Sequence, residues 1–230
     1  MISGREEIES LRGEFARLDC LYVADGHHRS ASASRVAAQR RAANPDHTGQ
    51  EEYEYFLAVI FPDKQMHILD YNRVVQDLAG LGEEAFLDRI RERFTVEPTD
   101  SPRPAQPRHF GLYLEGRWFR LVARDGSYPA EDPVGSLDVA ILQNNLLAPV
   151  LGIADPRTDK RIDFVGGIRG LRELEGRVAE GAAAGFALHP TSIHQLMAIA
   201  DAGEVMPPKS TWFEPKLRSG LIVRPLDDLS

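Results

Sequence analysis

Apolar residues recur at helical spacing in several parts of the chain. The first such stretch is REEIESLRGEFARL, in which the apolar residues stand three or four positions apart. This spacing places them on one face of a helix. The same pattern, together with helix-forming residues and caps, predicts helices over Arg5–Leu18, Ser30–Ala43, Glu83–Phe94, Leu137–Leu151, Leu171–Glu180 and from a cap at Thr191 to about Ala202.

Short runs of β-branched and aromatic residues predict strands. Tyr53–Phe61 (YEYFLAVIF) is such a run, and we expect it to be a central strand. After a turn at Pro62, Met66–Leu69 is expected to pair with it as a hairpin. Phe110–Arg124 alternates around Glu115-Gly116, which predicts a second hairpin. Further strands are expected over Cys20–Ala24, Arg161–Val165, Gly185–Leu188 and Gly220–Arg224.

Helices and strands therefore interleave with hairpins, which is typical of an α+β (mixed α/β) fold. Three prolines between Thr99 and Arg108 predict a linker or a surface loop. We expect two parts, residues 1–98 and residues 108–230, and leave open whether they pack as one unit.

Composition narrows the class of partner. The 230 residues include 27 Lys+Arg and 35 Asp+Glu, so the formal net charge is −8. This balance argues against nucleic-acid binding, which needs a basic face, but it is compatible with a small basic pocket for phosphate. No apolar run approaches the roughly 18 residues of a membrane-spanning helix. The single cysteine, Cys20, excludes an internal disulfide, and we interpret it as a buried, inert thiol in a cytoplasmic protein that binds no membrane.

The segment with the clearest chemistry lies where the first expected strand ends and a helix begins. A helix N-terminus offers unpaired backbone N–H groups and partial positive charge, and is therefore suited to anions. Gly26 allows close approach of the backbone, and Arg29 can bond two phosphate oxygens at once. His28 and Ser30 add further donors. This junction therefore predicts a phosphate-binding element.

Asp25 and His27 supply groups for acid–base chemistry in the same segment. Asp25 can accept a hydroxyl proton or bind Mg²⁺, and His27 can be charged or neutral near pH 7. The alternative is structural: Asp25 caps the helix, and the histidines lie on a solvated face. A zinc site is disfavoured, because adjacent histidines on a helix point about 100° apart and no third ligand is nearby.

Two other segments carry candidate contacts for substrate or phosphate. Lys209 and Ser210 lie in a proline-stiffened loop that lacks the glycines of a P-loop, so a rigid connector is the alternative interpretation. Asn72 and Arg73 follow an expected strand. Arg73 either pairs with a nearby carboxylate or clamps a substrate carboxylate.

Several motifs together resemble a large bacterial and archaeal family known as a domain of unknown function. The resemblance extends from Leu21 to Pro225 and rests on DGHHRSASASRV, ILDYNRVVQDL, LDVAILQNNLLAPVLGI, PTSIHQLMAIADAGEVMPPKSTWFEPKL and GLIVRP. The D-G-H-H-R element is also similar to that of free-serine kinases of the ParB/sulfiredoxin-like superfamily. The resemblance implies a ParB/sulfiredoxin-like nucleotide-binding element followed by a second α+β region.

The same resemblance implies phosphoryl transfer from ATP or ADP, with Mg²⁺, to the hydroxyl of free L-serine. By match to the kinase motif, Asp25 is the acidic residue near hydroxyl and metal. We assign Asp25 and His27 to catalysis. The phosphate-binding residues are then Gly26, His28, Arg29 and Ser30. The implied ligands are a nucleotide and a free amino acid, and a homodimer is a further expectation.

Family members usually carry a substantial region before D-G-H-H-R, in which the kinases place a catalytic glutamate. Only 24 residues precede Asp25 here, so we expect part of that region to be missing. Two alternatives to a kinase stay open. One is a non-catalytic, nucleotide-binding regulatory module; the other is a DNA-associated protein, against which the net charge argues.

Overall fold

The structure is a computed structural model that describes residues 2–218 and 220–226. The chain divides into two units. The first comprises Met1–Ile60 and Arg218–Ser230, and the second comprises Phe61–Leu217. The proline-rich segment between Thr99 and Arg108 lies inside the second unit, and the division into residues 1–98 and 108–230 stays a prediction of domain organisation.

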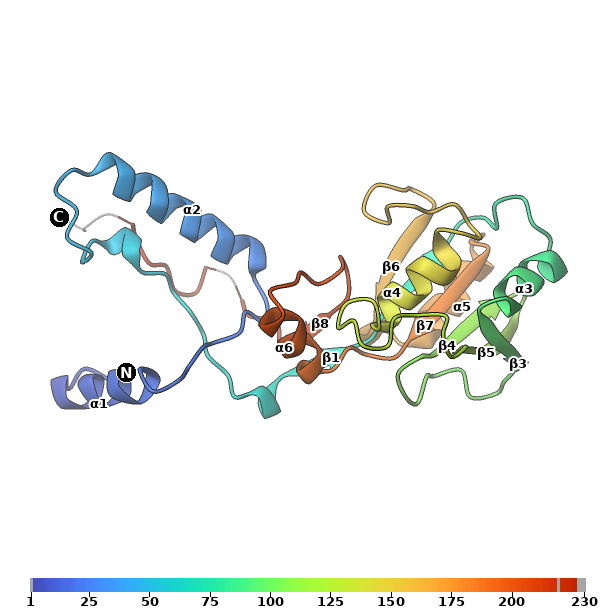
Figure 1. Cartoon of the computed structure of the whole chain (residues 1–230), viewed down its shortest axis with the longest axis horizontal. Helices are drawn as coiled ribbons and strands as arrows, with labels where there is room; N and C mark the ends of the chain where they lie inside the picture. The colour runs from blue at the N-terminus through green and yellow to red at the C-terminus, as the bar shows by residue number, and fades with distance from the viewer. Residues whose placement is uncertain (1, 219, 227–230) are drawn as a thin grey trace. The chain divides into compact units, whose positions relative to one another are not determined.

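The first unit contains two α-helices. Helix α1 spans Arg5–Phe15 and helix α2 spans His27–Ala43, so both expected helices are present and α2 begins three residues earlier than predicted (Figure 1). A 3₁₀ turn, η1 (Glu52–Glu54), contacts α2, and the Arg41 guanidinium lies 2.5 Å from the Glu54 carboxylate. The apolar residues of α1 are exposed, so this helix contributes no buried side chain.

Three expected strands are absent from the described part of this unit. Residues 20–24, 55–61 and 220–224 form no ladder, and Leu21, Phe56 and Leu221 are exposed. The prediction of strands here, including a central one at Tyr53–Phe61, was therefore wrong. The buried-thiol interpretation of Cys20 was also wrong, because this residue is exposed. Strand propensity specifies an extended backbone, but a strand needs a neighbour to bond its N–H and C=O groups.

The second unit is built on a six-stranded antiparallel sheet of order β3-β5-β4-β7-β2-β6. The strands are β2 (Tyr71–Val75), β3 (Phe94–Pro98), β4 (His109–Leu114), β5 (Arg117–Ala123), β6 (Ile162–Gly166) and β7 (Ala184–Leu188) (Figure 1). The hairpin expected at Glu115-Gly116 is confirmed as β4–β5, with Leu114 opposite Arg117. The mixed α+β class is likewise confirmed.

A second, two-stranded sheet pairs β1 (His67–Leu69) with β8 (Trp212–Glu214). The expected hairpin between Met66–Leu69 and Tyr53–Phe61 was wrong, because β1 takes its partner from near the C-terminus. A 3₁₀ turn, η2 (Asp63–Gln65), precedes β1, and another, η4 (Gly167–Arg169), follows β6.

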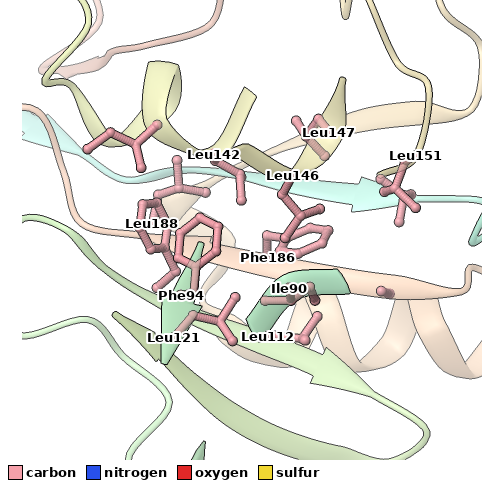
Figure 2. Packing of buried hydrophobic residues seen from close by; sticks show 14 of the residues in the cluster. Ile90, Phe94, Leu112, Leu121, Leu142, Leu146, Leu147, Leu151, Phe186 and Leu188 are labelled. Atoms are coloured by element: carbon pink, nitrogen blue, oxygen red, sulfur yellow. The ribbon is translucent and has the colours of Figure 1, made fainter. Parts of the chain in front are cut away.

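Helices cover both faces of the large sheet. Helices α3 (Glu83–Arg91) and α4 (Asp138–Leu142), with the π-helical turn η3 (Gln143–Leu147), supply side chains to the larger core cluster. Figure 2 shows Leu142 and Leu146 of this layer directed toward Phe186 and Leu188 of β7. Successive residues of a strand point to opposite faces of the sheet. Val75 of β2 therefore belongs to the larger core cluster, whereas Val74 packs in a smaller cluster with Leu174 of α5 (Leu171–Ala179).

The N-cap of the last helix, α6 (Ile193–Asp201), lies one residue later than expected. Ser192, not Thr191, is the N-cap: its hydroxyl accepts a hydrogen bond from the Gln195 N–H, and the Gln195 side chain accepts one from the Ser192 N–H. This reciprocal arrangement is a capping box. The Thr191 hydroxyl instead donates to the carbonyl of Ser210 at 3.2 Å, which ties the start of α6 to the loop before β8.

Candidate functional site

The D-G-H-H-R segment forms the N-terminus of α2. Gly26 is the N-cap and adopts the left-handed conformation, with φ 85° and ψ 29°. The N-cap residue is a glycine and offers no side chain to accept hydrogen bonds from the first N–H groups of the helix. The Asp25 carboxylate accepts a hydrogen bond from the Gly26 N–H at 2.9 Å, and the Gly26 carbonyl accepts one from Ser30 N–H at 2.9 Å.

Arg29 folds back over this turn. A Cβ atom placed on residue 26 would lie 3.0 Å from Arg29 Nη2 and 3.1 Å from Nε, so the guanidinium occupies the space that a side chain at 26 would need. Two reasons therefore favour glycine here: the positive φ and this close approach. Asp25, His27, His28 and Arg29 are all exposed, and Ser30 is half-buried. The structure thus presents a guanidinium, a helix N-terminus and a carboxylate at one exposed turn.

The same segment has limited capacity for a metal. Within the described residues, no group of three or more His, Cys, Asp or Glu side chains is placed to hold a metal ion. A zinc centre at His27 and His28 therefore lacks a ligand set. Magnesium differs, because it commonly binds one or two carboxylates and takes its other ligands from phosphates and water. Asp25 would supply the one carboxylate, so a magnesium site here also needs the phosphates of a bound nucleotide.

Arg73 and Lys209, predicted separately as ligand contacts, are brought together in the second unit. Arg73 Nη2 donates to the Lys209 carbonyl at 2.9 Å, and Nη1 donates to the Tyr71 carbonyl. Both cations lie over the rings of Tyr71 and Phe164, at 5.2–6.0 Å from the ring centroids. The expectation that Arg73 pairs with a nearby carboxylate was wrong for the described residues, since none of them forms an ion pair with it.

Asn72 and Ser210 lie beside these cations but bond protein groups. Asn72 is fully buried; its amide donates to Asp70 at 2.6 Å and its carbonyl oxygen accepts from the Leu188 N–H at 2.9 Å. The Ser210 hydroxyl donates to the Pro207 carbonyl at 2.6 Å. These bonds account for the burial of both side chains, and ligand contact by either one stays a prediction. The α2 residues belong to the other unit.

The sequence interpretation missed a buried carboxyl group. Asp138 begins α4 and is 7% exposed; its Oδ1 accepts from the Arg108 N–H at 2.8 Å, while no hydrogen bond from the described residues reaches Oδ2. Burial raises its pKa to about 7, against the opposing effect of the Arg108 N–H. A signal was present in LDVAIL, where one acid stands among apolar residues that all turn out to be buried.

A cleft of about 450 Å³ is lined in part by Arg108, the residue whose N–H binds Asp138. Arg108 and His109 line it together with Tyr128, and the Arg108 guanidinium lies 5.1 Å from the Tyr128 ring centroid. Burial, then the charge of Arg120, lowers the pKa of His109. The His109 ring also contacts the Gln106 amide at 2.8 Å. No residue of this cleft was predicted to bind a ligand.

Comparison with known protein families assigns the chain to one of them. Residues 1–140 match the family described as "Protein of unknown function (DUF1015)". The chain belongs to the DUF1015 family. This confirms the expected membership in a family of that kind. Curated proteins include no match to the chain.

Solved structures similar to this DUF1015 chain include free serine kinases. A mutant free serine kinase in complex with AMP has 13% identity and a TM-score of 0.45, over 92% of this chain and 81% of its own. A free serine kinase in complex with AMP that carries no stated mutation has the same identity and coverage and a TM-score of 0.43. A mutant free serine kinase in complex with ADP has 16% identity and a TM-score of 0.44, over 90% of this chain and 78% of its own. A conserved hypothetical protein from Pyrococcus furiosus has 16% identity and a TM-score of 0.44.

Within the described residues, none of the helices has both the length and the apolar character needed to cross a bilayer.

Proposed function

We propose that this DUF1015 chain contributes the phosphate-binding element of a nucleotide-dependent kinase that phosphorylates the hydroxyl of free L-serine. The observation that carries the proposal is the α2 N-terminus, where the D-G-H-H-R motif presents a left-handed glycine, uncapped backbone N–H groups and the Arg29 guanidinium. This motif is the part of the sequence that resembles free-serine kinases. The donor nucleotide is ATP or ADP.

Each residue of the element has a proposed task. The N–H groups at the start of α2 and the Arg29 fork bind phosphate oxygens, with His28 and Ser30 as further donors. Gly26 keeps the approach free of a side chain. Mg²⁺, held by Asp25 and the nucleotide phosphates, supplies charge neutralisation when bound.

The reaction joins the serine hydroxyl oxygen to the terminal phosphorus of the nucleotide and breaks the bond to the bridging oxygen. The products are O-phosphoserine and ADP from ATP, or AMP from ADP. The hydroxyl proton passes to a general base, a role we assign to Asp25 or His27. Most of the rate enhancement in such transfers comes from positioning and charge stabilisation.

The test is formation of O-phosphoserine by the full chain with Mg²⁺, L-serine and ATP or ADP, followed by ³¹P NMR. Asp25→Asn is expected to abolish product. Arg29→Ala is expected to weaken nucleotide binding by about tenfold or more, because it removes charge-assisted hydrogen bonds. Arg35→Ala, an exposed arginine on the same helix, is the matched control and should leave both unchanged. Absence of product with either nucleotide contradicts the kinase proposal.

A second candidate function is nucleotide binding without turnover, as in a regulatory module. The favouring observation is that Asp25 Oδ1 already accepts the Gly26 N–H, which is a structural role for this carboxylate. In this case nucleotide raises the melting temperature, Arg29→Ala removes the rise, and no O-phosphoserine forms. No rise at millimolar nucleotide would count against both candidates.

A further inference from the structure

Arg73 is a buried charge in the second unit. Its side chain lies on β2, is 4% exposed, and bonds the backbone carbonyls of Tyr71 and Lys209. Burial lowers the pKa of Arg73 to about 10, so the guanidinium still carries its charge near pH 7. Buried charges in proteins are normally paired with an opposite charge, because desolvation of an unpaired ion is costly. Carbonyl oxygens satisfy two donors but leave the charge uncompensated.

A second cation adds to the first. Lys209 Nζ lies 5.8 Å from the centroid of the Tyr71 ring and 6.0 Å from that of Phe164, the same two rings that Arg73 faces at 6.0 and 5.2 Å. Lys209 is exposed and adopts φ 56°, a left-handed conformation that is uncommon for a residue with a side chain. Non-glycine residues held in this conformation are found preferentially at ligand-binding positions.

Asp70, three residues before Arg73, and Glu214, five residues after Lys209, are engaged elsewhere. Asp70 accepts the Asn72 amide at 2.6 Å and lies 3.5 Å from Arg103. Glu214 accepts the Trp212 indole N–H at 2.9 Å and the Lys216 backbone N–H at 3.2 Å. Among the residues that the structure describes, no Asp or Glu forms an ion pair with either Arg73 or Lys209. Two positive charges thus lie near the same two rings, and neither has an ion-pair partner among the described residues.

We propose that Lys209 and Arg73 form a binding site for an oxyanion, the phosphate or carboxylate group of a small molecule. Lys209 contacts the ligand directly from its exposed position, and Arg73 supplies the buried positive charge and holds the Lys209 backbone. The rings of Tyr71 and Phe164 exclude water on one side, which strengthens the attraction. This site rests on its own contacts and does not depend on kinase activity at α2.

Trp212 provides an optical reporter, because its ring lies 5.5 Å from that of Tyr71. The chain has two tryptophans, so Trp118→Phe leaves Trp212 as the one emitter. In that full-length background, inorganic phosphate, acetate and chloride are titrated at constant ionic strength while Trp212 fluorescence is followed. We expect a saturable change with phosphate or with acetate and none with chloride. The anion that saturates identifies which oxyanion the site takes.

Substitution of Lys209 tests whether the change in Trp212 fluorescence arises from binding at this site. Lys209→Gln is expected to weaken binding by about tenfold or more, and Lys209→Arg to retain most of it, because the charge is kept. Lys160→Gln, at an exposed lysine of the same unit, is the matched control and should bind as the parent does. Arg29→Ala removes the α2 guanidinium and should leave the fluorescence response intact.

Two results would overturn the proposal. One is the absence of a saturable response to both phosphate and acetate. The other is a response that persists in Lys209→Gln, whether or not Arg29→Ala removes it. Failure of kinase activity alone does not bear on this site, because the fluorescence titration needs neither nucleotide nor turnover.

Discussion

The guanidinium of Arg73 donates a hydrogen bond to the backbone carbonyl of Lys209, 136 residues later in the chain, at 2.9 Å. This bond links β2, which lies between β7 and the edge strand β6, to the loop that precedes β8. The Thr191 hydroxyl makes a parallel link from the start of α6 to the Ser210 carbonyl. The loop carrying Lys209 is therefore attached to two elements, and its position depends on both.

Arg73→Lys tests how far the guanidinium holds this loop. A lysine keeps the positive charge but lacks the planar fork that reaches two carbonyls at once. We expect a loss of about 1–3 kcal/mol in the free energy of unfolding, together with faster amide hydrogen exchange near Lys209. Arg172→Lys, at an exposed arginine of α5, should change stability by less than about 0.5 kcal/mol. Equal effects of the two substitutions would contradict a structural role for the Arg73 fork.

Asp138→Asn should change how stability depends on pH. The folded state holds the pKa of Asp138 at about 7, above its ordinary value of 3.8. Between these values the unfolded chain has released the proton that the folded chain retains. The contribution of Asp138 to the free energy of unfolding is therefore fully present below about pH 4. This contribution falls as the pH rises from about 4 to 7, and it stays low above pH 7. The rise from 3.8 to about 7 corresponds to roughly 4 kcal/mol at most.

In Asp138→Asn the amide oxygen can still accept the Arg108 N–H, but no charge is buried at high pH. Denaturant unfolding at several pH values should show that the free energy of unfolding of the variant increases relative to that of the parent protein between about pH 4 and 8. Asp125→Asn, at an exposed aspartate of the cleft that Arg108 lines, should leave the slope of the parent unchanged. A parallel pH dependence in the parent and in Asp138→Asn would show that this carboxyl does not retain its proton on folding.

Two glycine substitutions are expected to act in opposite directions. A Cβ atom on Gly111 of β4 would lie 2.3 Å from the backbone carbonyl oxygen of Pro102, whereas one on Gly176 of α5 would meet nothing within 4 Å. Gly111→Ala should therefore destabilise the protein by about 1–3 kcal/mol, because the proline-rich segment must shift. Gly176→Ala should stabilise it by up to about 1 kcal/mol through helix propensity. Thermal unfolding of both variants measures the difference, and a stable Gly111→Ala would contradict the close packing of residue 102 on β4.

The thiol of Cys20 should react in the native protein. Cys20 is exposed, so a thiol reagent is expected to label one equivalent without denaturant. Mass spectrometry of the labelled protein measures the stoichiometry, and Cys20→Ser should take up none. Labelling that appears only after denaturation would support the buried position expected from the sequence.

Local patterns in the sequence were sufficient for the helices and for one hairpin. Helices bond within their own segment, so apolar spacing and caps predicted α1, α2, α3 and α5 to within a few residues. The β4–β5 hairpin was predictable for the same reason, because its two strands are neighbours across Glu115-Gly116. The D-G-H-H-R motif was likewise recognisable without the structure, since all its residues lie in one turn.

Pairing between distant segments was decided by the tertiary structure alone. Tyr53–Phe61 has strong strand propensity yet forms no ladder, while the three-residue strand β1 pairs with β8 near the other end of the chain. The contact between Arg73 and Lys209 and the burial of Asp138 belong to the same class. In each case the free energy depends on which remote group arrives beside the residue. Local spacing therefore determined the helices and the motif, and long-range packing decided the sheet order and the environment of the buried Arg73 and Asp138 side chains.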